Sequence, residues 1–90
     1  MVQLFQLMQD KSYPESGNLL FAILDDAIKT NQNVDIDMTN VISLPSMFLN
    51  ASFGKAFELH GKDSIKQRTK FYHIGKSQAE RLGEYFLRYQ

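Results

Sequence analysis

Hydrophobic residues recur along this chain with two different periods, and segments with one period alternate with segments with the other. A period of two, typical of a strand with one buried face, marks three segments: 2–8, 34–38 and 69–74. Spacings of three and four residues, typical of an amphipathic helix, mark three others: Ser16 or Gly17 to Lys29, 46–60, and 77–89. The order β-α-β-α-β-α predicts a small α/β domain with a mostly parallel sheet covered by helices.

Residues with capping propensity stand at the expected ends of the helices. Ser43 and Ser46 are both suited to cap the start of the second helix, because a serine side chain can accept a bond from a free backbone N–H. Gly61 is suited to end that helix. Ser77 and Glu80 form the Ser-x-x-Glu pattern of a capping box at the start of the last helix.

The segments between these elements are polar and short. We expect a loop over residues 10–18 and a turn over residues 62–66. The chain of 90 residues has no room for a linker, so residues 1–90 are predicted to form a single domain with a small core. Without cysteine, it has neither a disulfide nor a thiolate metal site.

The distribution of apolar residues predicts a cytoplasmic protein that does not enter the membrane. The longest unbroken apolar run, residues 19–24, is far shorter than the roughly 18 residues that a membrane span needs. The first ten residues lack the basic segment and the long apolar stretch of a signal peptide.

A formal net charge of zero, from 10 basic and 10 acidic residues, hides a marked asymmetry. Residues 1–53 carry six acidic and two basic side chains, a net charge of −4, and residues 54–90 carry eight basic and four acidic ones, a net charge of +4. Such a charge dipole can steer a partner toward one side of the domain, but solvated polar faces are the favoured explanation for it.

The chain shows no arrangement of residues that is typical of catalysis, so we expect a protein that is not an enzyme and uses no cofactor. Gly75-Lys76-Ser77 follows a strand but lacks the preceding glycine of a phosphate-binding loop. His60 and His73 have no partner at metal-ligand spacing. Asp35 and Asp37 share the outer face of a strand, where they could serve a small enzyme subunit that is complete only in an oligomer.

A basic segment next to two aromatic residues offers a second hypothesis for function. Clustered positive charge binds phosphates and aromatic rings stack on bases, so a nucleic-acid-associated accessory protein is the alternative, with these candidate contacts: Lys62, Lys66, Arg68 and Lys70. The zero net charge of the whole chain disfavours nucleic acid as the partner.

The second helix carries the surface that most favours a protein partner. Glycine inside a helix costs about 1 kcal/mol relative to alanine, so Gly54 indicates a close approach, either by another element of the chain or by a partner protein. The candidate partner face lies opposite the buried stripe of this helix and includes the turn before it: Ser43, Ser46, Met47, Asn50, Ala51, Gly54 and Glu58.

The central stretch, residues 34–57, resembles the bacterial STAS-like domains, which are related to the STAS domains of anti-sigma-factor antagonists. An alternating strand ends in Asp37, a serine-containing turn follows, and the next helix opens with Phe48-Leu49 and continues Phe53-Gly54-Lys55. The resemblance implies a small α/β fold and a non-catalytic regulatory domain. Such a domain docks on a protein partner, which in the antagonists is a histidine-kinase-like ATPase. Whether the domain also forms a homo-oligomer stays open.

The resemblance also points to one candidate phosphosite, Ser46. In the antagonists a serine at the start of this helix is phosphorylated by the partner kinase, and Ser46 occupies that position. The flanking positions differ from the antagonist pattern, because Pro45 replaces an aspartate, Met47 a second serine and Phe48 a glycine. Ser46 is therefore either a phosphorylation switch or a helix cap.

Overall fold

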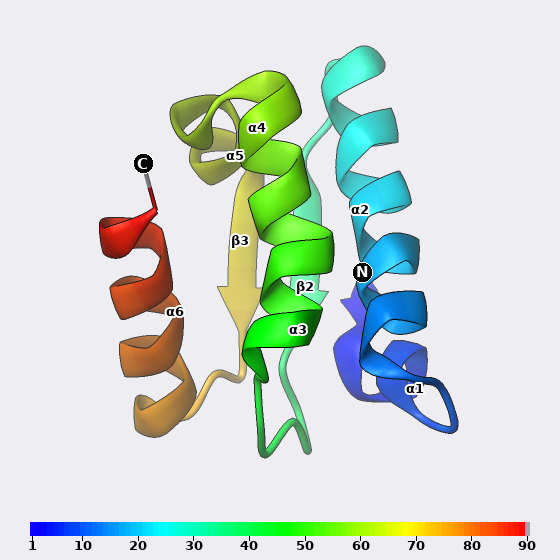
Figure 1. Cartoon of the computed structure of the whole chain (residues 1–90), viewed down its shortest axis with the longest axis vertical. Helices are drawn as coiled ribbons and strands as arrows, with labels where there is room; N and C mark the ends of the chain where they lie inside the picture. The colour runs from blue at the N-terminus through cyan, green and yellow to red at the C-terminus, as the bar shows by residue number, and fades with distance from the viewer. Residues whose placement is uncertain (90) are drawn as a thin grey trace.

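A computed structural model describes residues 1–89 of the chain (Figure 1). Three strands and several helices alternate along it. In chain order they are β1 (Val2–Gln3), α1 (Leu4–Met8), α2 (Tyr13–Lys29), β2 (Val34–Asp37), α3 (Ser46–Leu49), the π-helical turn η1 (Asn50–Gly54), α4 (Lys55–His60), α5 (Lys62–Arg68), β3 (Thr69–Tyr72) and α6 (Lys76–Arg88). Within residues 1–89 no helix has the length and apolar character needed to cross a bilayer.

The three strands form one parallel sheet in the order β1-β2-β3. This confirms the expected α/β fold with a parallel sheet, in which helices connect successive strands. The central strand β2 aligns Ile36 with Val2 on one side and with Phe71 on the other. Ile36 is fully buried, so the middle of the sheet rests on the core.

The two faces of the sheet differ as the alternating pattern predicts. Val34, Ile36 and Met38 are buried under the helices, and Figure 1 shows α2 and the helix that follows β2 in front of the sheet. Asp35 and Asp37 point to the opposite face and are partly exposed, aligned with Lys70 and Tyr72 of β3. The helices therefore pack on the apolar face, and the other face is polar.

The segments α3, η1 and α4 form one uninterrupted helical path from Ser46 to His60, which we call the central helix. Its bounds match the predicted helix, but its middle turn is π-helical. The buried Ser52 hydroxyl donates to the Phe48 carbonyl at 2.8 Å, and the hydroxyl of Tyr89 donates to the Gly54 carbonyl at 2.9 Å. Side chains thus provide hydrogen bonds at the widened turn.

The first predicted strand is wrong beyond its second residue. Only Val2–Gln3 is extended, and residues 4–8 form the short helix α1. Leu4, Leu7 and Met8 are spaced by three and four residues, and Leu4 is fully buried. The same apolar positions fit both periods over so short a segment, and packing against α2 selects the helix.

Three predicted element ends also need correction. Helix α2 begins at Tyr13 rather than at Ser16 or Gly17, because Ser12 caps it by accepting a bond from the Glu15 N–H at 3.2 Å. The expected turn over residues 62–66 is part of the helix α5, which packs its buried Ile65 against the core. The expected capping box at Ser77 is absent, since α6 begins one residue earlier and Gly75 precedes it.

Candidate functional site

The carboxyl ends of the three parallel strands meet at one end of the molecule, where all the arrowheads in Figure 1 point. In open parallel sheets this edge is where ligand sites form, because the connecting loops leave a crevice there. The loop from β2 to the central helix, residues 38–45, emerges at this edge and is the longest connection in the described chain. The candidate site is therefore centred on this β2–α3 loop.

Side chains of α6 hold the β2–α3 loop by its backbone. The Gln78 amide donates to the carbonyls of Val41, at 3.0 Å, and Ile42, and the Arg81 Nε donates to the Leu44 carbonyl at 3.0 Å. Leu44 is buried, which anchors the end of the loop in the core. The loop is therefore fixed by specific bonds rather than by secondary structure of its own.

Exposed apolar side chains gather on and beside this loop. The Ile42 side chain is 86% exposed and Met47, on the first turn of the central helix, is 59% exposed. Phe5 of α1 and Tyr13 of α2 are also exposed. We call these four residues, together with Ser43, the docking surface.

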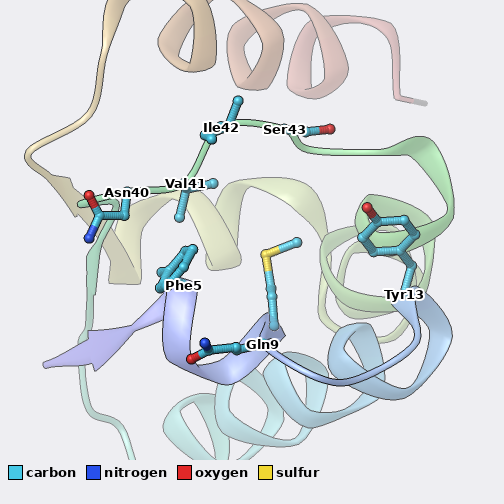
Figure 2. A pocket seen from close by; sticks show the side chains of 8 residues that line it. Phe5, Gln9, Tyr13, Asn40, Val41, Ile42 and Ser43 are labelled. Carbon is cyan, nitrogen blue, oxygen red and sulfur yellow. The ribbon is translucent and has the colours of Figure 1, made fainter.

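The docking surface borders a hollow of about 190 Å³ between α1, the start of α2 and the loop, and its lining also includes Met8. Figure 2 shows Phe5 and Val41 facing each other across it, whereas the Ile42 side chain points away from the hollow.

Ser46 is the first residue of α3, and Pro45 occupies the cap position without a side-chain bond. The expectation that Ser46 or Ser43 caps this helix is therefore wrong, since proline fixes the backbone there and neither serine accepts a bond from the first turn. Ser46 is exposed, and its hydroxyl accepts a bond from Nη2 of Arg81 at 3.1 Å. A guanidinium thus lies beside the candidate phosphosite.

Most of the candidate partner face on the central helix contacts the chain itself. Gly54 is buried, and a Cβ there would lie 2.6 Å from the Tyr85 hydroxyl of α6. Ala51 is half-buried, at the point where the α2 residue Gly17 approaches most closely. Of the two close approaches that Gly54 indicates, the structure therefore shows the one by another element of the same chain, α6.

The outer residues of that face also bond to α6. Asn50 and Glu58 are exposed, but their side chains accept bonds from the hydroxyls of Tyr85, at 2.8 Å, and Tyr89, at 3.0 Å. Burial raises the pKa of Tyr85 to about 12. For Tyr89, burial and the bond to Glu58 both raise the pKa. Three predicted residues, Ser43, Ser46 and Met47, stay open to a partner at the start of the helix.

Two residues of the basic segment bond to other parts of the chain. The Lys62 ammonium donates to the carbonyls of Phe86, at 2.8 Å, and Tyr89, at 3.2 Å, so it binds the end of α6. Arg68 donates to the Asn31 side chain. Lys66 and Lys70 are exposed. Because two of the four predicted contacts bond within the chain, the observed surface weakens the nucleic-acid hypothesis.

Two histidine–aspartate pairs connect elements that are far apart in sequence. His60 Nε2 lies 2.7 Å from Asp25 in the joint between α4 and α2, and His73 Nδ1 lies 3.0 Å from Asp37 at the carboxyl edge of the sheet. Bonds from the Thr39 side chain, from His73 and from the Thr39 N–H lower the pKa of Asp37 to about 2. Among residues 1–89, no three His, Asp or Glu side chains are close enough together to hold a metal ion.

Gln78 and Arg81 are the site residues that the sequence did not suggest. They lie three residues apart on α6, and Tyr85 follows at the next helical spacing, so one polar stripe faces both the loop and the central helix. The spacing is visible in the sequence, but its partners are backbone carbonyls, which any sequence supplies. Only the fold shows which carbonyls these side chains meet.

Comparison with known proteins gives one finding. The family model described as a STAS-like domain of unknown function matches residues 16–79, which is most of the chain. No curated protein and no solved structure gives a significant match. The chain therefore belongs to this STAS-like family, as the central stretch suggests.

Proposed function

We propose that this member of the STAS-like family is a non-catalytic regulatory domain that binds a protein partner through the docking surface. One observation carries the proposal. Ile42 is 86% exposed in the middle of a loop whose carbonyls, at Val41, Ile42 and Leu44, are all bonded by α6. The ordered loop thus keeps a large apolar side chain exposed to solvent.

Because the β2–α3 loop is already fixed by α6, the entropic cost of binding a partner is lower. Ordering a flexible loop on binding costs conformational entropy, and a loop fixed in advance avoids much of that cost. Apolar residues that enter a well-packed centre carry most of the binding energy in protein interfaces. Ile42 and Met47 supply such side chains, and the hollow beside Phe5 supplies a pocket for a partner side chain.

For the partner, the family resemblance supports a histidine-kinase-like ATPase, which implies a cytoplasmic setting. Phosphorylation of Ser46 would add about two negative charges next to the docking surface. Arg81, 3.1 Å from the hydroxyl, is placed to bond a phosphate there. Because Arg81 also bonds the Leu44 carbonyl, a phosphate that draws it away would loosen the end of the loop. The proposed switch therefore acts on how the loop is held.

A binding experiment with matched variants tests the docking surface. Titration calorimetry would use the purified chain and a kinase-like ATPase encoded beside its gene. Ile42→Asp is expected to weaken binding at least tenfold. Leu87→Asp is the control, because Leu87 is 81% exposed and lies at the other end of α6, and it should bind like the parent. Equal effects of the two variants, or no binding by the parent, would contradict the proposal.

The phosphorylation step has its own test. Incubation of the chain with the ATPase and ATP should add one phosphate by intact mass, and Ser46→Ala should remove that mass shift. Ser64→Ala is the control, since Ser64 is exposed on α5 and lies outside the docking surface. A mass shift that persists in Ser46→Ala would exclude Ser46 as the switch while leaving the docking surface untouched.

A further inference from the structure

His73 ends a strand at the carboxyl edge of the sheet and is held there in an unusual backbone conformation. It follows β3 directly, and its φ of 55° lies in the left-handed region that few residues other than glycine adopt. Its imidazole bonds Asp37, at the end of the neighbouring central strand, at 3.0 Å. Backbone strain of this kind collects at functional positions when the surrounding structure enforces it.

The bond to Asp37 determines which ring nitrogen carries the proton. The Asp37 carboxylate accepts bonds from the Thr39 hydroxyl, at 2.6 Å, and from the Thr39 N–H, at 3.0 Å. These bonds favour its ionised form, and an ionised carboxylate can only accept. Nδ1 of His73 must therefore be the donor, which leaves the lone pair of a neutral imidazole on Nε2.

The two histidine–aspartate pairs differ in their access to solvent. His73 is 69% exposed, whereas the His60 side chain is 14% exposed between α2 and α4. His60 also uses its Nε2 to bond Asp25, so the free nitrogen differs between the two pairs. Only His73 combines an oriented ring, a partner carboxylate and an Nε2 that an incoming molecule can reach.

A hollow of about 170 Å³ lies beside Asp37 and is lined also by Gln3, Gln6 and Asn40, together with Phe5 and Thr39. His73 does not line this hollow, and its imidazole is open to solvent.

We propose that His73 is a phosphoryl-acceptor site, with Nε2 as the nucleophile and Asp37 as the residue that orients it. A phosphoryl donor with a good leaving group, of the phosphoramidate or nucleoside triphosphate class, supplies the group. The Nε2–P bond forms as the bond from phosphorus to the leaving group breaks, and the electron pair of the broken bond departs with the leaving group. Nδ1 keeps its proton, and the Asp37 carboxylate stabilises the positive charge that develops on the ring. His73 and Asp37 are distinct from Ser46 and from the residues that make up the docking surface.

The test uses phosphoramidate, a small donor that requires no kinase. The folded chain would be incubated with it at neutral pH, with the rate followed by intact mass and the site mapped by fragmentation under non-acidic conditions. Phosphorus NMR would distinguish Nε2 from Nδ1 modification. We expect one phosphoryl group on Nε2 of His73 and none on His60, which serves as the internal control in the same sample.

Two comparisons show whether the structure, rather than exposure alone, makes His73 reactive. A peptide of residues 69–78 and the chain in concentrated urea should both react about tenfold more slowly. Asp37→Asn, checked for folding by circular dichroism, should lower the rate by about tenfold, the low end of the effect that losing a partner carboxylate has at a metal-binding histidine. Equal rates for folded chain and peptide, an Nδ1 product, or an unchanged rate in Asp37→Asn would each overturn the proposal. Loss of docking in the binding experiment would not affect it.

Discussion

The central helix packs against two neighbours in opposite ways. On one side α2 approaches at backbone distance, since a Cβ on Gly17 would lie 2.6 Å from the Ala51 Cβ and 2.9 Å from the Phe48 carbonyl oxygen. On the other side α6 contacts it through long side chains, with Phe86 edge-on to Phe57 at 5.0 Å between ring centroids and Tyr85 reaching Asn50. The α2 side is fixed by main-chain geometry, and the α6 side by the ends of side chains.

This difference separates the contacts that keep the domain folded from those that hold the proposed docking loop. Backbone contacts cannot adjust to an added atom, whereas the end of a tyrosine side chain can move at little cost. The same helix α6 holds the proposed docking loop through Gln78 and Arg81. Loosening of α6 is therefore expected to alter the presentation of Ile42 while the α2 side keeps the domain folded.

The largest expected effect is on the α2 side, where Gly17→Ala should lower the free energy of unfolding by about 2 kcal/mol. Alanine raises helix propensity by about 1 kcal/mol, but overpacking against a rigid backbone costs up to about 3 kcal/mol. Urea unfolding followed by circular dichroism measures the difference. Gly83→Ala is the matched control, because Gly83 lies in α6 and an added Cβ would have no neighbour within 4 Å. It should stabilise the chain by about 1 kcal/mol, and the same loss in both variants would refute the comparison.

The same substitution on the α6 side should have a smaller effect. An added Cβ at Gly54 would also lie 2.6 Å from a neighbour, but that neighbour is the hydroxyl of Tyr85, which can swing away. Gly54→Ala is expected to stay within about 1 kcal/mol of the parent, because the propensity gain offsets the strained hydrogen bond. In a Tyr85→Phe background the substitution should become stabilising, and a double-mutant cycle measures this coupling. A loss as large as that of Gly17→Ala would contradict the flexible character of this side.

These two glycines also show how far sequence alone could lead. The alternation of β2, the central helix and the polar outer face at Asp35 and Asp37 follow from periodicity, and the structure confirms them. Gly54 signals a close approach, but the sequence does not reveal that α6 of the same chain makes it. For residues 4–8 the sequence predicts a strand, because a segment of that length satisfies both periods and only tertiary packing decides between them.

The site was predicted only in part for a related reason. Exposure of Ser43, Ser46 and Met47 follows from their place in the loop and first turn of the central helix, whereas the role of Arg81 depends on the Leu44 carbonyl, 37 residues away along the chain. Bonds from side chains to distant main-chain atoms leave no pattern in the sequence. The pairing of His73 with Asp37 cannot be predicted from the sequence for the same reason, since the two residues meet only because β2 and β3 are parallel neighbours.

A smaller effect on stability is expected at high pH, on the α6 side of the central helix. Burial raises the pKa of Tyr85 from 10.0 to about 12, and its neutral hydroxyl donates to Asn50. A raised pKa in the folded state means that the contribution is complete below pH 10 and is lost as the pH rises toward 12. The urea midpoint of the parent should therefore fall over this range, and Tyr85→Phe should reduce the slope. Tyr13→Phe, at an exposed position on α2, is the control and should keep the parental slope.

The smallest expected effect is on the α2 side at low pH. The hydrogen bond from Lys29, followed by that from His60, lowers the pKa of Asp25 below 3.8. A lowered pKa means that this contribution is present above pH 3.8 and is lost as the pH falls below that value, because protonation removes the charge that both partners bond. Asp25→Asn should therefore flatten the acid slope of the urea midpoint and leave the alkaline slope unchanged. Its exposed neighbour provides the control Asp26→Asn, which should keep both slopes. If Asp25→Asn changed the alkaline slope instead, the two sides of the central helix would not be energetically separate.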